Sequence, residues 1–384
     1  MSKPVVTVGL IGYQFMGKAH SNAYRQVGRF FDLPATVRMK TICGRTEAGV
    51  SAAARTFGWE GYSTDWRDVI GDPEIDVVDV STPGDSHCEI VCAAAQAGKA
   101  VFCEKPIGNT LAEAEKMAEA VRKGGKPSAV FHNYRKAPAV TLAKQWIEEG
   151  RLGKIYHIRS AYLQDWIADP TFPLVWRLKK EQAGSGSLGD IGSHIIDLAR
   201  YLVGEFTEVC GMTETFVKRR PLVGSTDDKL GATASTETGE VTVDDAAVWI
   251  ARLGTGVVGT FEATRFAVGR KNYNRFEING EKGSLVFNLE RMNELEWFDA
   301  GAPEGSQGFS TIQVTEACHP YAGQYWPVGH IIGYEHTFVN LVADAVTAVA
   351  TDGRCAPDME DGLANQRVLD AVERSAASRA WVSL

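Results

Sequence analysis

Residues 5–17 read VVTVGLIGYQFMG, a mainly apolar run followed by a turn that holds Gly12 and Gly17. A buried strand that leads through such a turn into a helix presents backbone N–H groups to the pyrophosphate of a dinucleotide. In the full G-x-G-x-x-G pattern the middle glycine lets the pyrophosphate approach the backbone, and here Gln14 stands in that place. The first cofactor-binding candidates are the residues of this turn: Gly12, Gln14, Phe15, Met16 and Gly17.

The segments that follow repeat the order of strand and helix as far as residue 133. Short apolar runs alternate with stretches whose apolar residues recur every three or four positions, which is typical of βαβ units on a parallel sheet. The expected strands are Val5–Ile11, Val37–Cys43, Val77–Val80, Val101–Cys103 and Ala129–Phe131, and the expected helices lie near His20–Val27, Glu47–Phe57, Cys88–Ala97 and Leu111–Lys123. We predict an α/β Rossmann domain over residues 1–133, although Gly12 and Gly17 taken alone could be structural turn residues.

After residue 133 strands with period-two alternation dominate. They are expected at Tyr156–Gln164, Val241–Leu253, Val257–Thr264, Phe276–Asn279, Ser284–Asn288 and Leu295–Phe298, with helices at Val140–Glu149, Leu188–Leu202, Glu335–Ala350 and Gly362–Ala377. Two glycine-rich stretches, Gly224–Gly239 and Gly301–Gly308, are expected to be surface loops. The sequence therefore predicts a second, α+β domain over residues 134–384, built on a large, mostly antiparallel sheet.

Composition limits the class of protein. A chain of 384 residues exceeds what one hydrophobic core covers, which agrees with two domains. The net charge of −8 argues against nucleic-acid or anionic membrane partners, and the short basic run Lys218–Arg220 is expected to be a solvated loop. Without a long apolar run or a signal-peptide pattern, we expect a cytoplasmic protein. The seven cysteines form no C-x-x-C pair, so we expect reduced, mostly buried thiols and no metal site.

Polar residues at the predicted strand ends supply further cofactor candidates, because open α/β sheets bind ligands at that edge. The second strand is followed by Arg45, without the acidic residue that usually binds the ribose of NAD. Arg45 could accommodate the 2′-phosphate of NADP or stack on adenine, so these residues leave the choice of nicotinamide cofactor open. Four residues near the end of a later strand either contact ribose and nicotinamide or cap the next helix: Ser81, Thr82, Pro83 and His87.

Two short segments carry the residue types that hydride transfer from an alcohol requires. Glu104, Lys105 and Pro106 end a strand, and residues 189–194 (GDIGSH) enter a helix with Asp190 and His194 four positions apart on one face. A histidine oriented by a carboxylate can take the hydroxyl proton, and a nearby ammonium lowers the pKa of the alcohol. Each also has a structural interpretation: Asp190 as helix cap, His194 as a partly buried helix residue and Lys105 as a surface charge.

Together these segments resemble the Gfo/Idh/MocA oxidoreductases, and the resemblance spans essentially the whole chain. It is carried by the glycine turn, Glu104–Pro106, residues 150–155 (GRLGKI) and residues 189–194. Within the family, the chain is most similar to the glycoside 3-dehydrogenases in residues 131–135, 162–166, 176–177, 180, 183–186 and 319–321. The resemblance implies that Lys105, Asp190 and His194 are catalytic, that Glu104 and Lys105 lie at the cofactor, which is NAD, and that the open face of the second sheet lines the sugar site and forms a homo-oligomer, a dimer or tetramer.

The expected substrate is a sugar or glycoside. Flat rings and hydrogen-bond donors suit a polyhydroxylated ring, and the substrate-binding candidates are Tyr134, Gln164, Trp166, Arg177, Lys180 and His194. Trp166 and Trp176 could instead be core aromatics, and the charges at Arg177, Lys179 and Lys180 would also suit an anionic sugar. The leading interpretation is net oxidation, at C3. The alternatives are a redox-neutral glycosidase that oxidises C3 transiently, eliminates, adds water and re-reduces, and a nucleotide sensor without catalysis.

Overall fold

The computed structural model describes residues 3–225, 233–254 and 256–384 and divides into two compact units. The first comprises Met1–Lys136 and Gly333–Gln366, and the second comprises Ala137–Ile332 and Arg367–Leu384. The first crossing lies close to the boundary expected from the sequence. Residues 333–366, which the sequence analysis placed in the second domain, group with the first unit.

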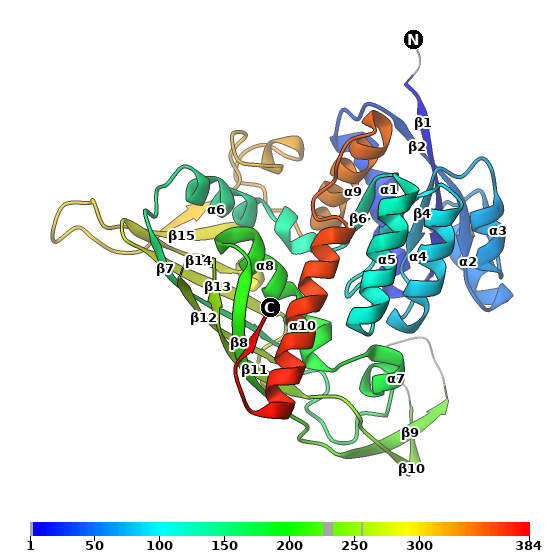
Figure 1. Cartoon of the computed structure of the whole chain (residues 1–384). Helices are drawn as coiled ribbons and strands as arrows, with labels where there is room; N and C mark the ends of the chain where they lie inside the picture. The colour runs from blue at the N-terminus through cyan, green and yellow to red at the C-terminus, as the bar shows by residue number, and fades with distance from the viewer. Residues whose placement is uncertain (1–2, 226–232, 255) are drawn as a thin grey trace. The chain divides into compact units, whose positions relative to one another are not determined.

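The first unit is a Rossmann fold, as predicted (Figure 1). Its six-stranded sheet has the order β3-β2-β1-β4-β5-β6, and every pair is parallel. The strands are β1 (Val5–Ile11), β2 (Thr36–Cys43), β3 (Gly61–Ser63), β4 (Val77–Val80), β5 (Ala100–Cys103) and β6 (Ser128–Val130). The helices are α1 (Phe15–Phe30), α2 (Glu47–Phe57), α3 (Trp66–Gly71), α4 (His87–Gln96), α5 (Leu111–Gly124), α9 (Tyr334–Thr351) and the start of α10 (Met359–Ser378).

The strand order reverses between β1 and β4, and this is where open α/β sheets bind ligands. The carboxyl ends of the two strands are bonded to each other. The backbone N–H of Ser81 donates to the carbonyl oxygen of Ile11 over 2.8 Å, and the Ser81 hydroxyl lies 3.3 Å from the carbonyl oxygen of Gly12. The glycine turn and the loop after β4 therefore form one edge of the predicted dinucleotide site.

Helix α9 belongs to the first unit because its apolar stripe completes that core. Phe338 is buried, and its ring centroid lies 6.0 Å from that of Phe131 and 5.6 Å from that of His20. Sequence periodicity predicted this helix but not the sheet that it covers, since an apolar face does not identify its partner.

The second unit contains a nine-stranded sheet with the order β16-β15-β14-β13-β7-β12-β11-β8-β17. The pair β7–β12 is parallel, and the other neighbours are antiparallel, so the sheet is mostly antiparallel as predicted. Its strands are β7 (Ile155–Leu163), β8 (Phe206–Glu214), β11 (Ala246–Leu253), β12 (Val257–Thr264), β13 (Tyr273–Gly280), β14 (Gly283–Asn288), β15 (Glu294–Asp299), β16 (Ser310–Gln313) and β17 (Val382–Ser383). Its helices are α6 (Pro138–Glu148), α7 (Lys180–Ala183) and α8 (Ser193–Val203), with the end of α10.

Helices cover one face of this sheet. The ring of Trp146 in α6 packs against Trp297 of β15, and the ring of His194 in α8 lies against Tyr162 of β7. The opposite face carries apolar side chains that are 45% to 63% exposed: Met212, Val248, Ile250 and Val258. This alternation leaves one broad face of the sheet open.

The described part of the stretch Gly224–Gly239, expected to be a loop, belongs to a strand pair. β9 (Arg219–Ser225) and β10 (Thr233–Glu240) are antiparallel, while residues 226–232 of that stretch lie outside the described residues. Arg220, expected on a solvated loop, is fully buried. Its guanidinium donates to the carbonyl oxygens of Ile167 and Asp169 over 2.6 and 2.8 Å, so it holds the loop that carries Trp166. The other expected loop, Gly301–Gly308, is an exposed turn region.

Within the described ranges, no helix has the length and apolar content to cross a membrane, and no three His, Cys, Asp or Glu side chains gather as metal ligands. All seven cysteines are free thiols, of which Cys43, Cys92, Cys103 and Cys355 are buried and Cys318 is exposed.

Candidate functional site

The turn after β1 fits a dinucleotide because its glycines cannot be replaced without a collision. Gly12 has a φ of 111°, and a β-carbon there would lie 2.5 Å from the Ser81 hydroxyl oxygen. A β-carbon on Gly17 would lie 2.3 Å from the carbonyl oxygen of Gly12. Gln14 and Phe15 are exposed at the start of α1. The turn thus leaves the amino end of the helix open to a pyrophosphate.

Tyr13 covers the end of β2, where a dinucleotide-binding domain usually carries its ribose ligand. The Tyr13 hydroxyl lies 2.7 Å from the Thr46 hydroxyl oxygen, and a β-carbon on Gly44 would collide with the Tyr13 ring. Arg45 is exposed beside them. Sequence reasoning did not select Tyr13, because it occupies a variable position of the glycine turn.

The residues after β4 are bonded mainly to backbone. Thr82 accepts a hydrogen bond from Ser86 over 2.7 Å, and the buried ring of His87 lies between the carbonyl oxygens of Thr82 and Pro106, at 2.8 and 3.1 Å. His87 therefore ties the loop after β4 to the loop that holds Lys105. Contact of these residues, Pro83 included, with the cofactor remains a prediction.

Glu104 is buried, and the ring of His20 lies between its carboxylate and that of Asp79. The sequence analysis did not anticipate this arrangement. His20 Nε2 lies 3.0 Å from Glu104 Oε1, and His20 Nδ1 lies 2.9 Å from Asp79 Oδ2. Burial acts to lower the pKa of His20, but the two carboxylates outweigh it and raise that pKa to about 9. Burial acts to raise the pKa of Glu104, but the bond and charge of His20 lower it on balance.

In the second unit, two aspartates shape the entry to α8. Asp244 Oδ1 and Oδ2 accept the backbone N–H groups of Gly186 and Leu188 over 2.7 and 2.9 Å. A β-carbon on Gly186 would lie only 1.7 Å from the Asp244 carbonyl oxygen, so this position requires glycine. The hydroxyl of Ser187 donates to the carbonyl oxygen of Asp245 over 2.6 Å.

The segment Leu188–Leu202, which these contacts hold at its start, is not the single α-helix that the sequence predicted. Residues Leu188–Gly192 form a π-helical turn, and α8 begins only at Ser193. Asp190 therefore lies in the wider turn and His194 in the first turn of α8, so the two do not share a regular α-helix. Such π-helical insertions are frequent at functional sites.

Arg265 holds the carboxylate of Asp190. It is fully buried, and its Nη1 lies 3.4 Å from Asp190 Oδ2. The Arg265 guanidinium also lies over the ring of Trp166, at 5.6 Å from the ring centroid. Arg265 was missed because a single arginine after a strand has no spacing pattern.

A connected series of side chains links His194 to the predicted substrate residues. The Tyr162 ring, 5.8 Å from that of His194, carries a hydroxyl that donates to Asn272 Oδ1 over 2.6 Å. The same oxygen accepts from Gln164 Nε2 over 2.9 Å, and Trp166 Nε1 donates to Gln164 Oε1 over 3.1 Å. The structure thus brings Gln164 and Trp166 together with His194 and Asp190 in one unit.

The remaining substrate candidates have different settings. Arg177 stacks on Trp176 at 4.4 Å, and burial together with Arg265 lowers its pKa, while Asp190 opposes that shift. Lys180 is exposed and pairs with Glu373 over 3.6 Å. Tyr134 is buried in the first unit, which also holds Lys105, and its ring lies against Tyr334.

We expect Arg265→Met to destabilise the second unit. The variant removes the buried guanidinium that pairs with the Asp190 carboxylate and donates to the Asp244 carbonyl oxygen, a loss that costs about 1–3 kcal/mol of unfolding free energy. Urea unfolding followed by fluorescence measures the effect. Lys271→Met is the matched control, because it removes an exposed ion pair with Asp165 and should leave the midpoint unchanged. Equal midpoints for wild type and Arg265→Met would contradict the assigned pairing.

Comparison with known proteins places the chain in a family. Residues 6–132 match the oxidoreductase family with an NAD-binding Rossmann fold, and residues 140–286 match the Gfo/Idh/MocA C-terminal domain. The chain is 45% identical over 383 residues to levoglucosan dehydrogenase of Pseudarthrobacter phenanthrenivorans, covering 99% of this chain and 98% of that enzyme. It is also similar to an oxidoreductase domain protein of Kribbella flavida, with 50% identity, a TM-score of 0.94 and coverage of 100% and 99%.

A solved complex bears on the cofactor. Levoglucosan dehydrogenase in complex with NADH is 44% identical, with a TM-score of 0.94 and coverage of 99% of both chains. The NADH in that complex supports the interpretation of the glycine turn of this chain as part of a dinucleotide site. The choice that Arg45 left open falls to NAD, because the matching Rossmann fold is NAD-binding. The chain belongs to the Gfo/Idh/MocA oxidoreductase family and carries its NAD-binding Rossmann domain.

Proposed function

We propose that this protein is an NAD-dependent dehydrogenase of a neutral sugar or glycoside and that it oxidises the C3 hydroxyl. The observation that carries the proposal is the connected set of donors and rings around His194 in the second unit, namely Tyr162, Gln164, Trp166 and Asn272. Polar groups fixed in this way, beside an aromatic surface, suit a polyhydroxylated ring. A relative has been solved with NADH and levoglucosan, which supports a sugar substrate.

The proposed chemistry divides among three side chains. When bound, NAD accepts the hydride. His194 takes the proton of the substrate hydroxyl, and the Lys105 ammonium stabilises the negative charge that develops on that oxygen. Asp190, whose carboxylate is held by Arg265, orients the base. The similarity to levoglucosan dehydrogenase over 99% of the chain also supports catalysis over nucleotide sensing alone.

The charges near the π-helical turn favour a neutral substrate over an anionic one. Arg177 and Arg265 face the carboxylates of Asp190 and Asp244, and Arg220 faces Asp245. Arginines that are already offset by carboxylates supply little excess positive charge for a sulfonate. We therefore rank neutral glycosides above sulfonated or carboxylated sugars.

The test is an assay of the purified enzyme with NAD and a panel of neutral, sulfonated and carboxylated sugars, levoglucosan included. The expected result is net formation of NADH with neutral sugars. Substrate deuterated at C3 should pass its deuterium to NADH, whereas substrate deuterated at C2 should not. Phenol release from an aryl glycoside without net NADH formation would instead support the redox-neutral glycosidase and contradict the dehydrogenase.

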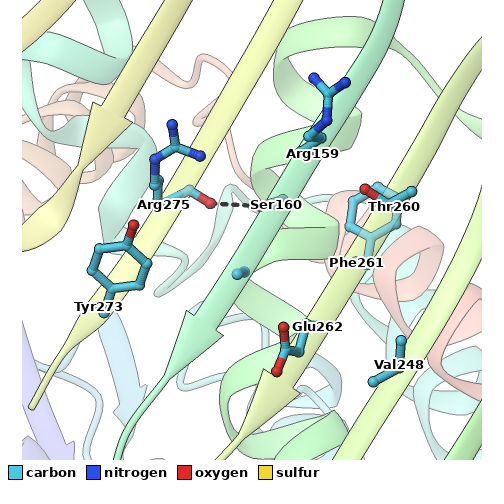
Figure 2. A pocket seen from close by; sticks show the side chains of 9 residues that line it. Arg159, Ser160, Val248, Thr260, Phe261, Glu262, Tyr273 and Arg275 are labelled. Atoms are coloured by element: carbon cyan, nitrogen blue, oxygen red, sulfur yellow. Dashed lines mark hydrogen bonds between the residues drawn. The ribbon is translucent and has the colours of Figure 1, made fainter. Parts of the chain in front are cut away.

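We further propose that the open face of the second sheet binds a second copy of the chain. Side chains of β7, β11, β12 and β13 line a hollow on this sheet (Figure 2). The volume of the hollow is about 330 Å³. Arg159, Arg275 and Glu262 line this hollow beside exposed Val248. A surface that carries both charge signs and exposed apolar groups can be complementary to its own copy about a twofold axis.

We expect Val248→Glu to dissociate the oligomer. Val248 is 46% exposed on the open face and is paired with Glu262 of β12, so a glutamate there would add a second carboxylate beside Glu262 and oppose association. Light scattering coupled to size-exclusion chromatography measures the mass. Val268→Glu, at a position 83% exposed and outside the sheet, is the control that should keep the wild-type mass. A monomeric wild type, or a Val248→Glu protein of wild-type mass, would contradict this interface.

A further inference from the structure

The side chain of His20 is sealed inside the first unit between two carboxylates. Its exposed fraction is 0%, as is that of Asp79, and the Glu104 side chain is 6% exposed. Asp79 and Glu104 approach opposite ring nitrogens, at 2.9 and 3.0 Å. Ionised carboxylates only accept hydrogen bonds, so when both carboxylates are ionised both ring nitrogens of His20 carry hydrogen and the ring is an imidazolium.

Both carboxylates have a second bond that extends the network. Asp79 Oδ2 accepts the hydroxyl of Tyr24 over 2.7 Å. Glu104 Oε2 accepts the backbone N–H of Lys105 over 3.0 Å. A continuous series of hydrogen bonds therefore runs from Tyr24 in α1, through Asp79 in β4 and His20, to the peptide of Lys105 after β5.

The remaining surroundings of His20 restrict its ring and exclude water. The Phe131 ring stacks on it, with centroids 3.8 Å apart, and the Phe338 ring lies 5.6 Å away. The titratable groups nearby are Tyr24, Asp79, Cys103, Glu104 and Lys105. The charge of Glu104 also contributes to the raised pKa of Tyr334. The positive charge of Lys105 lowers the pKa of Glu104, so two cations offset the two carboxylates.

We propose that protonated His20 is a positioning residue for Lys105, which it fixes by holding Glu104 against the Lys105 backbone. The inference rests on the proposed catalytic role of Lys105. If His20 lost its proton, its positive charge would no longer offset the buried carboxylates of Glu104 and Asp79. Glu104 would also lose the hydrogen bond that orients it. The Lys105 peptide, held by the other oxygen of Glu104, would then shift with it.

A pH dependence follows from the raised pKa of His20, about 9 when folded against 6.5 for the ordinary group. A group whose pKa rises on folding stabilises the folded state fully below its unfolded pKa. That contribution is lost as the pH rises from about 6.5 through about 9. The enzyme should therefore lose stability and turnover on the alkaline side.

The first test is a nitrogen-15 NMR titration of the histidines of the intact enzyme, with the His20 signals assigned by their shift in Glu104→Gln, which changes the partner of His20 Nε2. We expect His20 to remain an imidazolium up to about pH 9, with ring N–H protons that exchange slowly. A His20 ring that is neutral at pH 7 would overturn the proposal. This measurement needs no turnover.

The second test uses Glu104→Gln, which keeps the side-chain shape but turns one acceptor into an NH₂ group facing a donor. We expect kcat to fall by about 10- to 100-fold, as for catalytic groups misplaced by about 1 Å, and its alkaline limb to move to lower pH. Trp59→Phe is the control. Trp59 bonds Ser21 and packs on Tyr24 without touching a carboxylate, so this variant should lower Tm and keep the wild-type pH profile.

The outcomes separate this proposal from the proposed function. A wild-type kcat and pH profile for Glu104→Gln, beside an inactive Lys105→Ala enzyme, would overturn only the positioning role of His20. A fully active Lys105→Ala enzyme would overturn the catalytic role of Lys105 and, with it, the proposal. A His20 imidazolium together with a shifted Glu104→Gln profile supports it.

Discussion

His194→Gln is expected to lower kcat by about 10²- to 10⁴-fold, the range that a positioned general base supplies. Glutamine has a similar size and can form hydrogen bonds, but it cannot take a proton from the substrate. His194 is buried in the first turn of α8 with its ring against Tyr162, so the replacement should fold. Steady-state kinetics with the best sugar of the panel gives kcat, and quenching of protein fluorescence gives the Kd of NADH, which should stay near the wild-type value.

The matched control for His194 is His157→Gln. His157 lies on β7 in the same unit, partly exposed and away from α8 in the sequence. This variant should keep the wild-type kcat. A His194→Gln enzyme with wild-type turnover would remove His194 as the base and reopen the assignment among the polar residues around it.

Gly17→Ala is expected to weaken NAD binding by about 100-fold or more, because groups displaced by about 1 Å lose that much of their function. Its β-carbon would lie 2.3 Å from the carbonyl oxygen of Gly12, and backbone at this distance must move. Alanine favours a helix more than glycine does, so the loss cannot come from weaker helix formation. Isothermal titration calorimetry with NAD measures the effect directly.

Gly28→Ala separates collision from helix propensity. Gly28 lies in the same helix, α1, but a β-carbon there meets nothing within 4 Å. This variant should bind NAD normally and unfold at a slightly higher temperature. Normal NAD binding by Gly17→Ala would show that the turn tolerates the β-carbon and would contradict this prediction.

The first unit was predictable because each of its main strands is a short apolar run beside a helix of clear period. Strand β3 was missed because Gly61–Ser63 has three residues and no apolar pattern. The pair β9–β10 was missed for a related reason. Its threonines, serines and glycines are typical of loops, and the strands are held by tertiary contacts such as that of Arg220 with Ile167.

The candidate site was predictable where several chemical residues lie close in sequence, as in residues 104–106 and 189–194. The partners of those residues are single polar side chains from distant segments, such as His20 beside Glu104 and Arg265 beside Asp190, and no spacing identifies them. One signal was nevertheless present. An aspartate within the apolar strand Val77–Val80 requires a buried partner, since an unpaired carboxylate there would be too costly.

Because α9 belongs to the first unit, neither unit can be expressed alone as a simple truncation of the chain. The chain crosses between the units after Lys136, Ile332 and Gln366, so neither unit is encoded by one uninterrupted segment. A fragment that stops at residue 133 would uncover the rings of Phe131 and His20, which Phe338 shields in the intact protein. We expect such a fragment to aggregate through its exposed apolar rings and to be sensitive to proteolysis. An isolated first unit would need residues 333–366 as well, either joined by circular permutation or supplied by co-expression.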